Sequence, residues 1–220
     1  MLAPSERYAA ERGRGHKKLT GWARQMVLQV RRWLPDRALV LVADSSFAAL
    51  ELLAALLGQG MIGVTRPRLD AALYEPAPPR RRGTLGRPPT KGRRLPNLAN
   101  VLTAATTRWQ RVRVSGWYGE RDRLIGFCSA TAVRGHAGLP VVPIRWVLLR
   151  DPLGRFDPQA LLRTDPAREP LQILIWSSGA GRSRSSFARS ATTSGSRPDG
   201  NGRTWLSPAP PHAYAHCFRW

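Results

Sequence analysis

The chain has 220 residues, of which 35 are lysine or arginine and 14 are aspartate or glutamate, so its formal net charge is +21 at pH 7. This length suits one domain of ordinary size, or one domain with a tail. So large a positive charge favours nucleic acid as a partner, although GC-rich codons for arginine, alanine, glycine and proline also raise the arginine count.

Hydropathy and cysteine usage exclude further classes of protein. No apolar run reaches the ~18 residues that a membrane span needs, and residues 1–17 have no apolar core of a signal peptide. The two cysteines, Cys128 and Cys217, lie far apart and show no metal-ligand spacing. They favour a reducing, cytoplasmic setting without a zinc site.

The N-terminal third predicts a basic segment over residues 1–17, followed by an α/β core over residues 18–75. The residues that recur at steps of three and four are Leu19, Trp22, Met26, Val30 and Trp33. This spacing predicts an amphipathic helix, which Pro35 ends.

Two strands with a helix between them are predicted next. Residues 38–43 form a continuous apolar run, typical of a strand covered on both faces. A helix is expected from Ser45 or Ser46 to about Leu57, and residues 61–66 predict a second strand. Strand, helix and strand in so few residues indicate a βαβ unit with a parallel pair.

Asp44 follows the first predicted strand directly. It suits the N-cap of a helix, since a carboxylate there accepts a backbone N–H. It also suits a metal ligand, because open α/β sheets place ligands at the carboxyl ends of strands and carboxylates hold the divalent ions that cleave phosphodiesters. One aspartate is not a metal site, and position alone favours the cap.

Residues 76–108 predict an extended loop rich in proline, glycine and arginine. Between Pro76 and Gly119 the sequence has no acidic residue. The candidate contacts to nucleic-acid phosphates are Lys17, Lys18, Arg80, Arg81, Arg82, Arg87, Lys91, Arg93 and Arg94. The alternative is a solvated loop without a partner.

The remainder predicts a β-rich region over residues 109–176 and a disordered tail over residues 177–220. The first part alternates, contains further strand patterns and has turn chemistry at residues 151–155, which indicates an antiparallel meander. The second part is dominated by serine, glycine, arginine and alanine, with Asp199 as its one acid. The fold class is therefore α/β with a β-rich insertion and a disordered tail.

The string GRGHKKLTGWARQMVLQVRRWLPDRALVLVADSSFAALELL resembles the DDE transposases of bacterial insertion sequences, which have an RNase H-like catalytic core. The resemblance continues through VTRPRLDAALYEPAPPRRRGTLGRPP and VSGWYG to GLPVVPIRWVLLRDPLGRFDPQALLRTD, and so covers about residues 5–176. It implies a partial RNase H-like core. The β-rich stretch then resembles the insertion that such transposases carry between the second Asp and the Glu of their triad.

The resemblance also implies a role for Asp44, as the second member of an Asp-Asp-Glu triad that binds two Mg²⁺. In the intact family this triad cleaves and transfers DNA strands at transposon ends, and a homo-oligomer is one candidate state of assembly there. The family's first Asp lies upstream of HKKLT, where this chain has only Glu6 and Glu11, outside any predicted strand. The Glu-bearing helix with the Tyr-x2-Arg-x3-Glu-x6-Lys/Arg signature does not follow LQILIW. We therefore expect a truncated, catalytically inactive transposase fragment.

The tail is consistent with a frameshift near Trp176. With allowed third bases, the codons after Trp176 can be re-read as a string containing RWQVEV and QWSDLA, in which the missing Glu codon straddles Ser183 and Arg184. The coding DNA decides this prediction. Two other hypotheses stay open: a non-catalytic DNA-binding protein, such as a repressor of the parent element, and a reading frame whose product is unstable.

Overall fold

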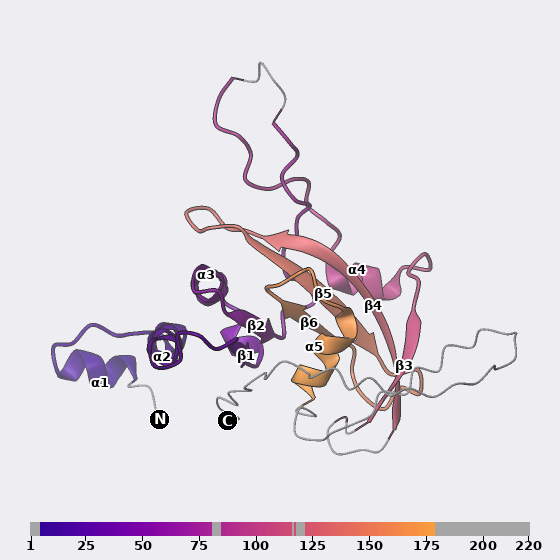
Figure 1. Cartoon of the computed structure of the whole chain (residues 1–220), viewed down its shortest axis with the longest axis horizontal. Helices are drawn as coiled ribbons and strands as arrows, with labels where there is room; N and C mark the ends of the chain where they lie inside the picture. The colour runs from indigo at the N-terminus through magenta and orange to yellow at the C-terminus, as the bar shows by residue number, and fades with distance from the viewer. Residues whose placement is uncertain (1–4, 81–84, 116, 118–121, 179–220) are drawn as a thin grey trace, which may run out of the picture.

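The computed structural model describes residues 5–80, 85–115, 117 and 122–178. The strands are β1 (Val40–Val42), β2 (Ile62–Thr65), β3 (Gln110–Val114), β4 (Arg123–Arg134), β5 (Val142–Arg150) and β6 (Gln159–Arg163). The helices are α1 (Glu6–Glu11), α2 (Leu19–Trp33), the 3-10 turn η1 (Ser45–Phe47), α3 (Leu50–Gly58), α4 (Leu98–Thr103) and α5 (Pro170–Ser177). Within this part of the chain the strands form one sheet in the order β1-β2-β6-β5-β4-β3 (Figure 1).

The amphipathic helix predicted from Leu19 is confirmed as α2. It ends at Trp33, just before Pro35, whose ring cannot continue the helix. Arg31 fixes this end, since its Nη1 donates to the carbonyls of Pro35 at 3.0 Å and Arg37 at 2.9 Å. Ala23, Val27 and Val30 pack on the core, and α2 contacts α3. Leu19 and Trp33 of the predicted apolar stripe are exposed instead.

The predicted βαβ unit is also confirmed. Strands β1 and β2 are parallel, with Val40 opposite Ile62 and Val42 opposite Val64. The connection crosses one face of the sheet as α3, which packs against β2 and β5 and buries Leu52, Leu53 and Leu56. The carboxyl ends of β1 and β2 therefore lie at the same edge of the sheet.

The helix predicted from Ser45 or Ser46 is divided into two pieces. The turn η1 covers Ser45–Phe47, and α3 begins only at Leu50. In a continuous helix the carbonyl of Ala48 would accept an N–H four residues later. Here it accepts a hydrogen bond from Arg134 Nη1 at 2.7 Å, so a side chain from β4 takes the acceptor at the break.

The β-rich region forms the predicted antiparallel meander and joins the βαβ unit through one further pairing. Strands β3, β4, β5 and β6 follow each other as antiparallel neighbours. Strand β6 then pairs antiparallel with β2, with Arg163 opposite Val64. The β-rich region and the βαβ unit thus share one sheet and one pair of buried faces.

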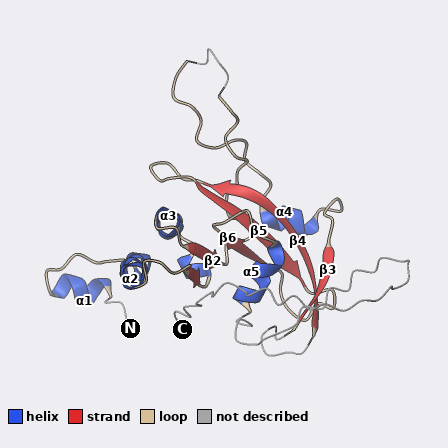
Figure 2. Cartoon of the chain, viewed as in Figure 1, coloured by secondary structure: helices blue, strands red, loops and turns tan. Residues whose placement is uncertain are grey.

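Each face of the sheet has its own core. On one face, leucines of α3 and Leu98 of α4 pack on Trp146 and Leu148 of β5. On the other face, Ile173 and Leu174 of α5 pack on the alternate residues of β5 and β6. Figure 2 shows α4 and α5 on opposite sides of the sheet. This two-sided cover explains the nearly continuous apolar sequence of β5.

Three helices arise where the sequence did not predict them: α1, within the predicted basic segment, and α4 and α5. Helix α4 lies inside the stretch predicted as a loop, because Asn97 caps it by accepting the N–H of Asn100 at 2.8 Å and Leu98 is buried beneath it. Helix α5 opens with Pro170, a residue suited to the first turn of a helix. It includes Ser177, the first residue of the predicted tail, and residues 179–220 of that tail lie outside the described residues.

Candidate functional site

Asp44 lies just past the carboxyl end of β1, at the end strand of the described sheet. It is exposed, and its Oδ1 accepts the backbone N–H of Ser46 at 2.9 Å. It is the N-cap of η1, so the capping role predicted from its position is confirmed. The cap uses one carboxylate oxygen, and Oδ2 has no hydrogen bond within the described part of the chain.

The turn that starts at Asp44 is tied to the far end of β4. Arg134, the last residue of β4, donates from Nη1 to the carbonyl of Ala48. Burial lowers the pKa of this arginine, yet a guanidinium stays charged at neutral pH. The next carbonyl, that of Gly135, accepts from Lys91 Nζ at 3.3 Å. The base of the basic loop and the turn after Asp44 therefore meet at the same end of β4.

The base of the basic loop, where residues 74–75 meet residues 91–94, is held in place by contacts of its own lysine and arginine side chains. Lys91 lies over the ring of Tyr74, with Nζ 3.7 Å from the ring centre. Arg93 forms an exposed ion pair with Glu75 at 3.0 Å. Tyr74 also bridges Arg94 and β4 through backbone pairing. Two of the candidate phosphate contacts, Lys91 and Arg93, thus also fix the loop to the sheet.

The other candidate cations divide between two places. Arg80, Arg87 and Arg94 are exposed on the loop, which projects away from the sheet (Figure 1). Arg81 and Arg82 lie outside the described residues. Lys17 packs 5.0 Å from the ring centre of Trp22, beside Lys18, which precedes α2. The structure does not gather the two basic segments into one patch (Figure 1).

A family model described as DDE superfamily endonuclease matches residues 2–123, more than half of the 220-residue chain. The chain belongs to this family. The match includes Asp44 and the whole basic loop, and it ends at the first residue of β4. A search of curated proteins finds no match.

Endonucleases of the DDE superfamily typically use divalent metal ions. A two-ion centre needs several carboxylates around one point. Within the described ranges no group of three or more histidine, cysteine, aspartate or glutamate side chains is placed to hold a metal. Asp44 offers one free carboxylate oxygen, so a two-ion centre does not fit the described residues. Glu6 and Glu11 lie on α1, where Glu11 pairs with Arg7 at 3.0 Å.

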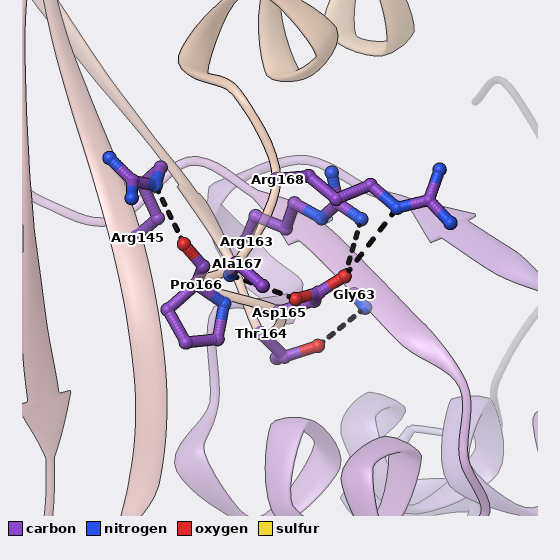
Figure 3. Close-up of polar contacts among 8 residues, drawn as sticks. All are labelled: Gly63, Arg145, Arg163, Thr164, Asp165, Pro166, Ala167 and Arg168. Carbon is purple, nitrogen blue, oxygen red and sulfur yellow. Dashed lines mark hydrogen bonds and ion pairs between the residues drawn. The ribbon is translucent and has the colours of Figure 1, made fainter.

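Two other acidic residues follow strands of the described sheet. Asp151 directly follows β5, and its carboxylate is paired with Arg123 at 3.0 Å. Asp165 follows β6, at the opposite edge from Asp44. Strand β6 runs against β1 and β2, and Thr164 exchanges hydrogen bonds with Gly63 near the start of β2 (Figure 3). Asp44 follows the end of β1 instead. The carboxylates of Asp44 and Asp165 therefore cannot share a metal ion in this fold.

Asp165 instead serves a buried cation, Arg163. The Arg163 side chain is 0% exposed, and its Nη2 donates to Asp165 Oδ2 at 2.8 Å (Figure 3). Its guanidinium lies 4.5 Å from the ring centre of Trp176 on α5. Nε and Nη1 have no hydrogen-bond partner among the described residues, and burial is the main cause that lowers the pKa of Arg163.

Sequence reasoning missed a group of side chains around Trp109, Arg111 and Arg150. Alternation in the segment that became β3 could have placed Arg111 and Arg113 on one face. The pairing partners across the sheet were not readable, because antiparallel register depends on the connections between strands.

No helix in the described residues has the length and apolar character to cross a membrane.

Proposed function

We propose that this chain is a transposase-derived DDE endonuclease that binds DNA, keeps Asp44 as one metal ligand and does not cleave DNA by itself. In the intact family the corresponding activity is strand cleavage and transfer at insertion-sequence ends. The observation that carries the proposal is the contact network through Arg134 and Lys91. It joins the Asp44 turn to the base of the basic loop.

This network supports DNA as the partner. A loop anchored beside Asp44 can present its exposed arginines to phosphates while the carboxylate faces the same bound duplex. Phosphate contacts of this kind give affinity that falls steeply with salt. A titration of labelled duplex with the full chain, at several salt concentrations, measures that slope. A slope near zero contradicts DNA binding by this chain.

Loss of cleavage is the finer part of the proposal. One carboxylate with one oxygen already engaged holds a metal pair poorly. We expect no cleavage or strand transfer when the chain is incubated with terminal-repeat DNA and Mg²⁺. Cleavage that disappears in Asp44→Ala contradicts this part. Asp36→Ala, which removes another exposed carboxylate without touching the η1 cap, is the matched control.

A second candidate function is a non-catalytic regulator, such as a repressor of the parent element. The exposed cations at Arg87 and Arg94 favour it, since they need no intact catalytic centre to bind DNA. Gel shifts with terminal repeats and with random duplex of equal length separate the two cases. Selective binding of the repeats supports a repressor, and equal binding supports attraction by charge alone.

The decay of the reading frame and a cytoplasmic location are parts of the same proposal. The nucleotide sequence that follows the Trp176 codon tests the first. A shifted frame that encodes a Glu-bearing helix after Trp176 would support it. A shifted frame without such a helix would contradict it.

A further inference from the structure

We propose that a pocket between Arg111 on β3 and Arg150 on β5 binds a phosphodiester of the DNA backbone. The inference rests on the proposed DNA binding and adds a contact site that lies outside the basic loop and the N-terminal lysines. The pocket has a volume of about 280 Å³. This is just below the roughly 300–1,000 Å³ of typical small-molecule sites, so it suits a small charged group better than a whole cofactor.

The strand register places both arginines on one face. Arg111 is opposite Gly126 of β4, and Gly126 is opposite Arg150 of β5. Residues directly opposite each other in antiparallel strands project to the same side of the sheet. Two guanidinium side chains therefore flank a residue with no side chain. The pocket is the space left between them, and Trp109 and Pro152 complete its wall.

Gly126 and Trp109 orient one of the two cations. A Cβ at Gly126 would lie 3.2 Å from Cγ of Arg150, so the glycine lets that side chain lie across β4. The guanidinium carbon of Arg150 then lies 4.0 Å from the ring centre of Trp109. Stacking of this kind holds the planar group while leaving N–H donors at its edge for a bidentate contact with phosphate.

The charge of the pocket is not balanced by the protein. Neither Arg111 nor Arg150 has a carboxylate partner within the described ranges. Asp151 also lines the pocket, but its carboxylate is 1% exposed and accepts from Arg123 and from the N–H groups of Leu153 and Arg155. Its charge is therefore already compensated, and two cations remain for an incoming anion.

The pocket lies toward the edge of the sheet that carries Asp44. Strand β5 runs in the same direction as β1, because β2 and β5 are both antiparallel to β6. Arg150 is the last residue of β5, and Asp44 follows the end of β1. Three strand spacings, about 14 Å at ~4.8 Å each, separate β1 from β5, and by the register Arg150 lies a further ~10 Å along the strand direction. One bound duplex can thus reach both positions.

The salt dependence of DNA binding tests this site. Each phosphate contact contributes about −0.9 to the slope of log K against log salt concentration. Because both arginines contact the same phosphodiester, we expect the double variant Arg111→Gln/Arg150→Gln to flatten the slope by about one unit, and each single variant by part of that. Between 50 and 200 mM salt, the double variant then loses about 3.5-fold less affinity than the wild type. The readout is fluorescence anisotropy of a labelled duplex with the full chain.

Arg68→Gln is the matched control. It makes the same change in net charge, at an exposed arginine already paired with Asp70. The site is refuted if both pocket variants keep the slope of Arg68→Gln while the wild type binds DNA, and that result leaves the proposed function intact. A wild type without affinity for duplex overturns both. Thermal melts confirm that each variant is folded.

A variant that keeps the charge tests the geometry of the pocket. Gly126→Ala displaces the Arg150 side chain by a few tenths of an ångström without removing a cation. We expect it to weaken binding at fixed salt several-fold while leaving the slope near that of the wild type. Wild-type affinity in Gly126→Ala means that the orientation of Arg150 does not matter, and it overturns the bidentate contact.

Discussion

Removing the two partners of the buried ion pair should have unequal effects. Arg163 is fully buried with two unsatisfied N–H groups, whereas Asp165 is 31% exposed and supports it from the surface. Asp165→Asn leaves a buried cation without its carboxylate. Arg163→Met removes the cation itself and keeps a side chain of similar length, which still contacts the Trp176 ring.

The magnitudes follow from these burial differences. A hydrogen bond to a charged group contributes about 1.5–3 kcal/mol, and breaking a fully buried pair costs about 3–5 kcal/mol. Because Asp165 is partly solvated, we expect Asp165→Asn to cost about 2–3 kcal/mol. For a chain of this size, this lowers Tm by roughly 5–10 °C. Replacing a buried ion pair with apolar atoms is often neutral, so Arg163→Met should stay within about 1 kcal/mol of wild type.

A double-mutant cycle checks the reasoning. Urea unfolding followed by circular dichroism gives the free energy of unfolding for the wild type, both single variants and the double variant. In the Arg163→Met background, Asp165→Asn should cost under about 1 kcal/mol, because no buried charge remains to be stranded. Asn also keeps an oxygen to accept the Ala167 N–H, which Asp165 Oδ1 accepts at 3.0 Å. Equal costs for the two single variants, or additive costs in the double variant, refute the account.

Three further predictions follow from close packing and burial. Gly63→Ala should destabilise the fold by about 1–3 kcal/mol in urea unfolding, because its Cβ would lie 2.8 Å from a leucine methyl of α3, whereas Gly58→Ala, with open space around it, should not. The folded-state pKa of Asp151 is lowered, so its charge stabilises the fold above about pH 4 and this stabilisation is lost as the pH falls through the lowered pKa. Asp151→Asn should therefore have a lower Tm than the wild type at neutral pH, and this difference in Tm should close in acid. Burial raises the pKa of Cys128 to about 11, and the charge of Arg150 partly opposes this rise. In a variant whose other cysteine is replaced by serine, iodoacetamide at pH 8 should therefore react with Cys128 roughly a hundredfold more slowly than with a free thiol. The additional change Arg150→Gln should slow this reaction further. Reaction at the rate of a free thiol would contradict that assignment.

The elements that periodicity determines were predictable, and those that side-chain contacts determine were not. The stripe from Leu19 to Trp33 needs only local spacing, so α2 was found together with its end. The βαβ unit follows from one apolar run, one helix and a second apolar run. The break at Ala48 depends on Arg134, 86 residues away, and no local pattern encodes that contact. Helix α4 depends on an asparagine cap and one buried leucine inside a sequence that otherwise has loop composition.

The same distinction applies to the candidate site. The position of Asp44 after a strand was readable, and so was its capping role. The pocket of Arg111 and Arg150 was not, because it exists only where the register of three strands sets a glycine between two arginines. A single sequence gives the alternation of each strand but not which rows meet, since a shift of one residue would send one of the arginines to the other face.

The two interpretations of Asp44 are compatible in the fold, and this compatibility decides what a substitution can show. Oδ1 holds the Ser46 N–H, while Oδ2 is free of hydrogen bonds among the described residues. Asp44→Asn keeps a cap oxygen and removes the charge that a metal ion needs, whereas Asp44→Ala removes both. A change in Mg²⁺-dependent DNA binding that appears equally in both variants therefore reports on the charge. A change confined to Asp44→Ala, with a loss of about 0.5–2 kcal/mol in stability, reports on the cap alone.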